Sequence, residues 1–208
     1  MDRTLVRVDT GTLYVRYRRD VGEATWRDAT RVAWWMLQYT LGVIDAENVA
    51  VQALRSFKGK EEKWLRETCE VWFTDYVLTH VAPKGRSAVE RHTLDGDVVA
   101  IVTGATPYAA LPLARELGIP HVVATELEVA DGRFTGRVAP PMAYGQGKVV
   151  LTERLAEEQG FSLEESTFYS DSITDLPLLE RVRTPIVINP DRRLRRIAEK
   201  RGWRIERW

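Results

Sequence analysis

Short apolar runs alternate with helical segments along the second half of the chain, and this alternation is the strongest constraint on the fold. Four such runs occur, at residues 98–102, 121–125, 168–171 and 185–188. Helical patterns separate and follow them, at residues 107–117, 147–159, 176–182 and 191–200. An uninterrupted apolar run is typical of a strand that is buried on both faces. Strand–helix alternation therefore predicts an α/β fold with a parallel sheet and right-handed crossovers.

The region before residue 85 has a helical pattern instead. Residues 25–40, 45–57 and 60–80 carry apolar side chains at helical spacing, whereas residues 1–20 are poor in core-forming residues. Four of the seven tryptophans fall in this region: Trp34, Trp35, Trp64 and Trp72. Packing in a helical bundle is the favoured role for them, and an aromatic ligand box is the alternative. We therefore expect a helical insertion near the start of an α/β domain.

The composition argues against several classes of function. The 208 residues include 30 basic and 30 acidic side chains, so no excess charge favours nucleic acid or an acidic membrane surface. One cysteine, Cys69, cannot build a disulfide framework or a cysteine-ligated zinc site. No apolar run approaches the roughly 20 residues that span a bilayer, and we expect no signal peptide. These features predict a soluble, cytoplasmic protein and leave its oligomeric state open.

Two acidic residues lie at the end of the third predicted strand and in the turn after it. Asp171 and Asp175 are four residues apart at the carboxyl end of a predicted strand, where open α/β sheets bind their ligands. Clustered carboxylates suit Mg²⁺, which takes one or two protein carboxylates and keeps several waters. The alternative is that Asp171 caps the next helix and Asp175 is solvated in its first turn.

Two further segments could bind an anion. Thr103 and Gly104 end the run 98–102 and open a helix, where a hydroxyl and free N–H groups suit phosphate, although a simple turn is the alternative. Lys148 follows Tyr-Gly-Gln-Gly at the start of a helix, where the helix dipole disfavours a cation. Phosphate or a carboxylate cluster would compensate this lysine, and a solvated surface position is the alternative.

In chain order these motifs resemble those of the haloacid dehalogenase superfamily of phosphatases, most closely its phosphoserine-phosphatase-like subfamily IB. Thr103 matches the second family motif, Lys148 the third, and Asp171 with Asp175 the fourth. Residues 128–136 resemble the hairpin between the second and third motifs. The resemblance implies a three-layer, Rossmann-like parallel sheet. It divides the chain into a core, residues 1–11 and 86–208, and a helical cap, residues 12–85.

The first family motif is incomplete. It consists of a central buried strand followed by Asp-x-Asp-x-Thr, whose first Asp is the nucleophile, and this chain begins Met-Asp-Arg-Thr. Asp2 therefore aligns with the second Asp and Thr4 with the Thr, whereas the nucleophile and its strand would precede Met1. A missing central strand leaves backbone groups unpaired and strand edges exposed. We expect a truncated form of a working enzyme, inactive as it stands.

Two other classes of function stay open. One is a catalytically dead relative that binds a phosphorylated ligand. The other is a helical interaction module joined to an α/β domain, which predicts no Mg²⁺ at Asp171.

The resemblance implies roles for individual residues. The catalytic set would be Asp2 as general acid and base, Thr103 and Lys148 acting on the phosphoryl group, and Asp175 orienting Lys148 or a metal-bound water. Mg²⁺ would be held by Asp2, Asp171 and Asp175. A small phosphorylated metabolite would contact Thr4, Thr103, Gly104, Lys148 and Asp9. Because Asp9 replaces a family Glu that grips the amino group of phosphoserine, the identity of the substrate stays open.

Overall fold

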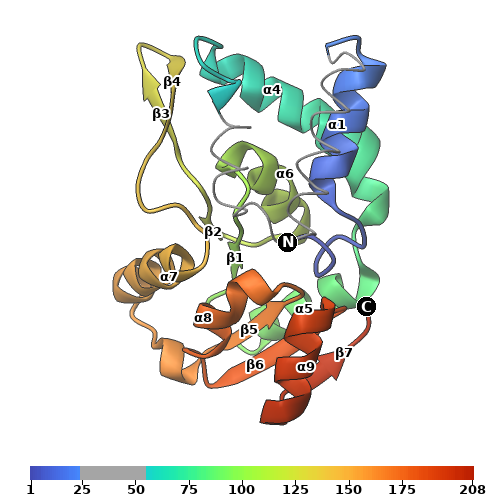
Figure 1. Cartoon of the computed structure of the whole chain (residues 1–208), viewed down its shortest axis with the longest axis vertical. Helices are drawn as coiled ribbons and strands as arrows, with labels where there is room; N and C mark the ends of the chain where they lie inside the picture. Colours follow the sequence, from blue (N-terminus) through green and yellow to red (C-terminus); the bar gives the residue numbers. More distant parts are fainter. Residues whose placement is uncertain (24–54) are drawn as a thin grey trace.

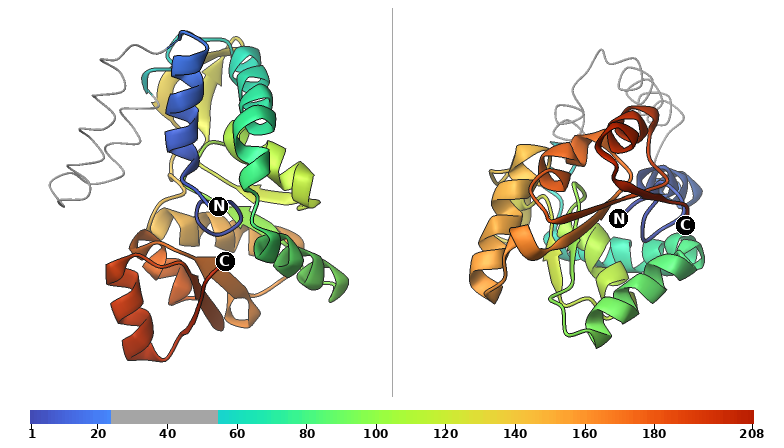
Figure 2. Two further views of the ribbon diagram at one scale, coloured as in Figure 1. Left: turned by 90° about the vertical axis from the view of Figure 1, so that its right-hand side faces the viewer. Right: turned by 90° about the horizontal axis from the view of Figure 1, so that it is seen from below.

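The computed structural model describes residues 1–23 and 55–208 of the chain. The helices predicted at 25–40 and over most of 45–57, with Trp34 and Trp35, lie outside the described residues. The remainder has an upper part built mainly of helices and a lower part built around parallel strands (Figure 1). A view from the side places the amino terminus between the two parts (Figure 2).

The upper part contains two long helices and a hairpin. They are α1 (Thr10–Asp20), α4 (Glu62–Trp72), and strands β3 (Leu127–Ala130) and β4 (Arg133–Val138). The predicted helix over residues 60–80 is confirmed, although α4 is followed by a π-helical turn at Phe73–Val77 and a 3₁₀ turn at Leu78–His80. The hairpin turns at Asp131 and Gly132, which both have positive φ, the geometry that an Asp-Gly turn provides.

Helix α1 did not show in the sequence pattern. Its buried residues are Thr10 and Tyr17, so it lacks the apolar stripe by which an amphipathic helix is recognised. A cap marks its start instead, since the Asp9 carboxylate accepts a hydrogen bond of 2.8 Å from the Thr12 N–H.

The lower part confirms the strand–helix alternation and its three-layer α/β class. Its helices are α5 (Pro83–Leu94), α6 (Pro107–Leu117), α7 (Gln146–Gln159), α8 (Leu176–Leu179) and α9 (Arg192–Arg201). Its strands are β1 (Ala100–Val102), β2 (His121–Val123), β5 (Thr167–Ser170), β6 (Thr184–Ile188) and β7 (Arg204–Glu206). The short strand β7, with Ile205 as its apolar residue, is an addition to the predicted elements.

The parallel sheet lies in two separate pieces. β1 pairs with β2, with Ile101 opposite Val122, and a second sheet has the order β5-β6-β7, with Tyr169 opposite Ile186. Within the described residues, no backbone ladder joins β1 to β5. The incomplete first motif predicts a missing strand in this sheet.

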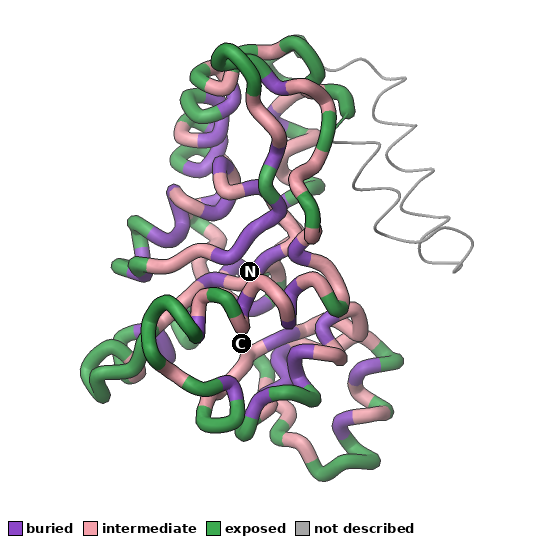
Figure 3. Tube along the Cα trace, turned by 90° about the vertical axis from the view of Figure 1, so that its left-hand side faces the viewer, coloured by how far each residue is buried: buried purple, intermediate pink, exposed green. Residues whose placement is uncertain are grey.

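One apolar cluster extends through both parts of the molecule. It includes Tyr17, Leu65 and Trp72 from the upper helices together with Ile101 and Leu113 from the core. Trp72 is 2% exposed, and burial of a side chain of this size stabilises the fold by about 3 kcal/mol. The buried residues therefore run continuously between the two parts (Figure 3). Among the helices that the structure describes, none is long and apolar enough to cross a membrane.

Candidate active site

A buried ion pair links α7 to the turn after β5. Lys148 Nζ donates a hydrogen bond of 2.6 Å to Asp175 Oδ1, and the side chains are 8% and 10% exposed. The hydroxyl of Ser170, at the end of β5, donates to Asp175 Oδ2 at 2.7 Å. The charge partner that Lys148 requires at the start of a helix is thus Asp175. The alternatives of a solvated Lys148 and a solvated Asp175 are both wrong.

The loop before α7 can turn tightly because it has glycine at position 147, where the backbone is crowded. A Cβ atom built on Gly147 would lie 1.9 Å from the carbonyl oxygen of Met142, so no other residue fits without a backbone shift. The same carbonyl accepts a hydrogen bond of 2.8 Å from the Tyr144 N–H. The tight loop fixes where α7 begins and therefore where Lys148 lies.

Asp171 follows β5 directly and has an unfavourable environment for its charge. Burial raises the pKa of its carboxyl group to about 6, the nearby Met1 amino group lowers that pKa, and Asp175 raises it. The Ser172 hydroxyl accepts a hydrogen bond from the Thr174 N–H and caps the next short helix, so the alternative interpretation of Asp171 as this cap is wrong. A bound cation would stabilise the charged form of this half-buried carboxylate.

The first residues of the chain curl into a turn beside this carboxylate. The Met1 carbonyl accepts hydrogen bonds from the N–H groups of Leu5, at 2.9 Å, and Val6, at 3.1 Å. The Met1 amino group is buried, and this burial lowers its pKa, although nearby Asp2 and Asp171 raise it and Lys148 also lowers it. Met1 therefore lies among the residues of the third and fourth motifs.

Asp2 and Thr4 are held by local hydrogen bonds. Burial raises the pKa of the Asp2 carboxyl group, and this effect is opposed by the Met1 amino group and by the Thr10 N–H, which donates to Oδ1 at 3.2 Å. Thr4 is buried and donates from its hydroxyl to the Asp2 carbonyl at 3.0 Å. The Asp9 carboxylate also raises the pKa of Asp2, although Asp9 itself caps α1.

Thr103 and Gly104 lie at the carboxyl end of β1, facing the loop that precedes α7. The Thr103 hydroxyl accepts a hydrogen bond of 3.2 Å from the Ala105 N–H, and its side chain is buried. A Cβ atom on Gly104 would lie 3.5 Å from the Ala143 carbonyl oxygen. The turn and the anion-site interpretations of this motif are therefore compatible, since the hydroxyl closes the turn from which the helix begins.

The three predicted metal ligands do not form one cluster. Within residues 1–23 and 55–208, no group of three or more His, Cys, Asp or Glu side chains could hold a metal ion. Both oxygens of Asp175 are hydrogen-bonded to Lys148 and Ser170. Asp171 remains as a half-buried carboxylate, and Mg²⁺ can bind through one or two carboxylates with water and phosphate oxygens completing its shell. The residues present therefore fit Mg²⁺ with Asp171 as one carboxylate ligand.

Ser170 is the participant that the sequence analysis missed. Its hydroxyl donates to Asp175 at 2.7 Å and accepts from the Ser172 N–H at 3.2 Å. A polar residue at the end of a buried apolar strand was the available signal, because such a residue needs a hydrogen-bond partner.

Comparison with known proteins agrees with these motifs. The sequence profile of the haloacid dehalogenase-like hydrolases matches residues 1–180. The chain is 26% identical to a histidinol-phosphatase of Neisseria meningitidis over 211 residues, which cover 99% of this chain and 95% of that protein. It is 33% identical to phosphoserine phosphatase SerB1 of Mycobacterium tuberculosis over 213 residues, which cover 99% and 68%.

A solved structure is also similar. A protein of unknown function from Bordetella pertussis Tohama I superposes with a TM-score of 0.90 at 32% identity, covering 99% of this chain and 94% of that one. The fold, the order of the motifs and these relatives all indicate the same family. The chain therefore belongs to the haloacid dehalogenase-like hydrolase family, within which it is a phosphatase similar to the phosphoserine phosphatases.

Proposed function

We propose that this phosphatase hydrolyses a small phosphorylated metabolite with Mg²⁺, through an aspartyl-phosphate on an Asp that directly precedes Met1. The observation that carries the proposal is the buried Lys148–Asp175 pair beside Asp171 and the Met1 amino group. This arrangement of a buried cation and a carboxylate with a raised pKa at one end of β5 supports the proposal.

The reaction would occur in two displacements. The nucleophilic carboxylate forms an O–P bond while the bond from phosphorus to the alcohol oxygen breaks, and Asp2 gives its proton to the leaving oxygen. Water then forms a new O–P bond while the bond between the aspartyl oxygen and phosphorus breaks, Asp2 takes a proton of that water, and phosphate and the free carboxylate are released. The raised pKa of Asp2 supports this role, because it favours the protonated form that the first step needs.

The phosphoryl oxygens would be bound from two sides. Thr103 and Gly104 lie at the start of the turn into α6, whose N-cap residue, Thr106, makes no side-chain capping hydrogen bond. The first N–H groups of that helix are therefore suited to an anion. On the other side, Lys148 would stabilise charge on the phosphoryl group while Asp175 orients its ammonium group.

Mg²⁺ would be held by the Asp171 carboxylate and the Asp2 carbonyl, together with the nucleophilic Asp. When bound, it would neutralise charge between the nucleophile and the phosphate. The described residues supply part of this binding set, and the preceding Asp would complete it.

We also propose residues 1–11 and 86–208 as the core and residues 12–85 as a cap that covers the site. The hairpin of β3 and β4 accompanies the cap, because Gly59 N–H donates to Phe134 O and Glu62 N–H donates to Gly132 O, at 2.8 and 2.9 Å. An apolar cluster shared by the two parts supports a closed arrangement that excludes water.

The substrate class that we propose is the phosphate ester of a small amino alcohol. Two relatives are named for phosphoserine and for histidinol phosphate, which are both esters of this kind. Asp9 could contribute an anionic contact to the amino group from its position near Asp2. The structure shows Asp9 as the cap of α1, which is compatible with one oxygen contacting a ligand.

The test is hydrolysis of p-nitrophenyl phosphate, phosphoserine and histidinol phosphate with and without Mg²⁺. Two chains are compared, one beginning at Met1 and one carrying an apolar strand that ends in Asp directly before Met1. We expect Mg²⁺-dependent release of phosphate from the extended chain and none from the other. Activity of the Met1 chain would place the nucleophile elsewhere. A folded extended chain that binds phosphate without hydrolysing any ester would favour the ligand-binding alternative.

A further inference from the structure

A cavity rich in charged side chains lies in the upper part of the molecule (Figure 1). It has a volume of about 440 Å³, and the described residues that line it are Arg18, Glu23, Lys60, Glu61, Trp64 and Arg133. An α-helix rises about 1.5 Å per residue, so Arg18 lies about 12 Å along α1 from Thr10, whose N–H binds Asp2. The cavity is therefore separate from the candidate active site.

One wall of this cavity is held by backbone pairing. The Phe134 N–H donates a hydrogen bond of 3.0 Å to the Lys60 carbonyl, and the Gly59 N–H donates to the Phe134 carbonyl at 2.8 Å. Glu61 and Arg133 form an antiparallel β-bridge. Lys60 and Arg133 thus extend from one short ladder, which fixes the positions from which their side chains start.

Both carboxylates that line the cavity are already paired. Arg18 Nε lies 2.8 Å from Glu23 Oε2, and the Arg133 guanidinium contacts Glu61. The lining residues include three cations, with Lys60 as the third, and two carboxylates. The described part of the cavity therefore carries one positive charge in excess.

Lys60 is the cation that lacks a carboxylate partner among the described residues. Its Nζ lies 3.8 Å from the centroid of the Trp64 ring. Lys60 is half-buried, and this burial lowers its pKa, with Arg18 adding to the effect and Glu23 opposing it. An indole face contributes about 0.5–2 kcal/mol to such a contact but does not neutralise the charge. An anion bound beside Nζ would stabilise the charged form of this amine.

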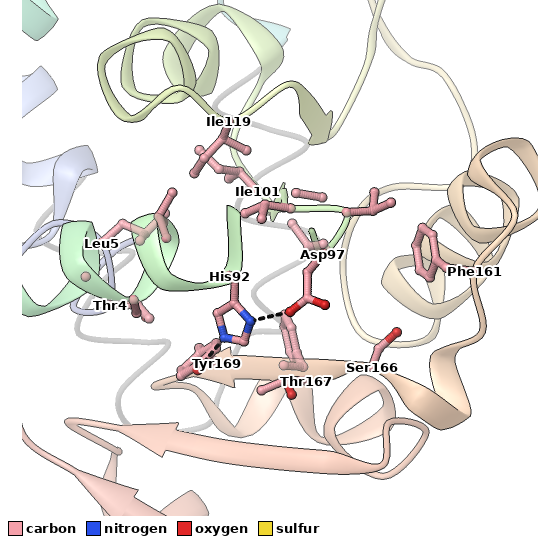
Figure 4. Close-up of a pocket in the computed structure, with 18 of the residues that line it drawn as sticks. Thr4, Leu5, His92, Asp97, Ile101, Ile119, Phe161, Ser166, Thr167 and Tyr169 are labelled. Atoms are coloured by element: carbon pink, nitrogen blue, oxygen red, sulfur yellow. Dashed lines mark hydrogen bonds and ion pairs between the residues drawn. The ribbon is translucent and has the colours of Figure 1, made fainter. Parts of the chain in front are cut away.

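Two other basic side chains of low exposure do have acceptor partners. In the cavity drawn in Figure 4, His92 Nδ1 lies 2.6 Å from the Asp97 carboxylate, and its Nε2 lies 2.8 Å from the Tyr169 hydroxyl. The buried Lys148 ammonium has a carboxylate partner at 2.6 Å. Lys60 differs from both, because the ring that it contacts supplies neither a negative charge nor an acceptor atom.

We propose that this cavity binds a small oxyanion, a phosphate or a carboxylate, which pairs with Lys60. The guanidinium groups of Arg18 and Arg133 line the same cavity and complete the site. A guanidinium carries five N–H donors, so an arginine that contacts one carboxylate retains donors for a second anion. The proposal does not rest on the phosphatase chemistry, since none of these residues belongs to the candidate active site.

The test follows the indole N–H signal of Trp64 by NMR while inorganic phosphate, or citrate in a parallel titration, is added at constant ionic strength. Trp64→Phe identifies the signal. We expect a saturable shift with at least one of the two anions and a Kd of about 1 mM. Lys60→Met keeps the stem on the ring but removes the charge, and it should weaken binding at least about tenfold. Lys60→Arg keeps the charge and should bind within about threefold of the original chain.

Lys63→Met is the matched control, because it removes the same charge from a side chain that is 80% exposed. Its affinity for the anion should stay within about twofold of the original. The proposal is overturned if neither titration saturates, if Lys60→Met keeps the saturable shift, or if Lys63→Met weakens binding as much as Lys60→Met does.

The reactivity of the Lys60 amine provides a second measurement. Acetic anhydride attacks the neutral amine, and a bound anion would favour the ammonium form. The anion that saturates the Trp64 shift should therefore slow acetylation of Lys60 at least about fivefold and leave that of Lys63 unchanged. Mass spectrometry of the digested protein gives both rates. Equal rates at Lys60 with and without the saturating anion would contradict binding at this amine.

Discussion

Lys148 and Asp175 form a buried ion pair in which Nζ and Oδ1 are 2.6 Å apart. Both charges have lost most of their water, since the side chains are 8% and 10% exposed. The Ser170 hydroxyl satisfies the second carboxylate oxygen. A buried pair with this many contacts contributes little more than an apolar pair would, but loss of one partner leaves an uncompensated charge.

We therefore predict that Asp175→Ala destabilises the protein by about 3–5 kcal/mol. The buried Lys148 ammonium loses its counter-charge in this variant and Ser170 loses its acceptor. The free energy of unfolding in urea measures the effect. Lys148→Met combined with Asp175→Leu should cost less than Asp175→Ala alone, because no buried charge remains in the double variant.

The control is an exposed pair of the same charge types. Lys63 and Glu67 are 3.7 Å apart with side chains 80% and 66% exposed, so Glu67→Ala should change stability by no more than about 0.5 kcal/mol. Equal losses from Asp175→Ala and Glu67→Ala would contradict the assignment of the Lys148–Asp175 pair as a buried interaction.

Gly147→Ala should be among the most destabilising single substitutions in the described part of the chain. Its new methyl group would lie 1.9 Å from the Met142 carbonyl oxygen, a backbone atom that cannot move alone. We expect a loss of more than about 3 kcal/mol in unfolding free energy. Gly104→Ala is the matched control, because its methyl group would meet the Ala143 carbonyl oxygen at 3.5 Å, an ordinary contact. If Gly147→Ala and Gly104→Ala unfold at the same temperature, the backbone around Gly147 is not crowded as described.

The sequence predicted the elements of the lower part well because their signals are local. The helix at 107–117 coincides with α6, whose ends are set by Pro107 and by Gly118 in the left-handed region. The same holds for α7, which ends before Gly160. By contrast, α1 and β7 carry few buried apolar residues, so their recognition depends on contacts that are remote in sequence.

The need of Lys148 for a counter-charge was predictable from the sequence, but the hydrogen-bond partners of Asp175 were not. Lysine at a helix start implied a counter-charge, and the structure supplies it from Asp175, 27 residues later. Both carboxylate oxygens of Asp175 are hydrogen-bonded, to Lys148 and to Ser170. These bonds depend on side-chain directions, which the spacing of residues in the sequence does not determine. The absence of a backbone ladder between β1 and β5 in the described residues required the folded arrangement.

The cap of α9 offers a prediction about stability in the core. Asp191 Oδ1 accepts hydrogen bonds from the N–H groups of Arg193 and Leu194, at 2.8 and 2.9 Å, and Oδ2 accepts from Ile173 N–H at 2.7 Å. Asp191→Ala should therefore cost about 2 kcal/mol, at the upper end for a helix cap. Asp191→Asn keeps an acceptor at the cap and should lose less than half as much in urea unfolding. Equal losses in the two variants would show that charge, and not capping, sets the effect.

The buried thiol of Cys69 should make the free energy of unfolding depend on pH in the alkaline range. It is buried in α4, and this burial raises the pKa of its thiol from 9.0 to about 12, with nearby Glu70 adding to the effect. The folded state therefore keeps the proton over a range in which the unfolded state releases it, so the contribution of Cys69 to stability is full below pH 9 and is lost as pH rises toward 12. Tyr14 and Tyr108, whose pKa values burial also raises to about 12, act in the same direction.

Comparison with Cys69→Ala isolates the thiol, because the tyrosines are present in both chains. The stability of the original chain relative to the variant should be constant from pH 6 to 8 and should then fall by up to about 1.4 kcal/mol per pH unit above pH 9. Urea unfolding at a series of pH values, under reducing conditions, measures this difference. The thiol should also react with a disulfide reagent much more slowly in the folded protein than in urea. A difference that stays flat to pH 10.5, with rapid reaction of the folded chain, would show that the Cys69 thiol ionises freely in the fold.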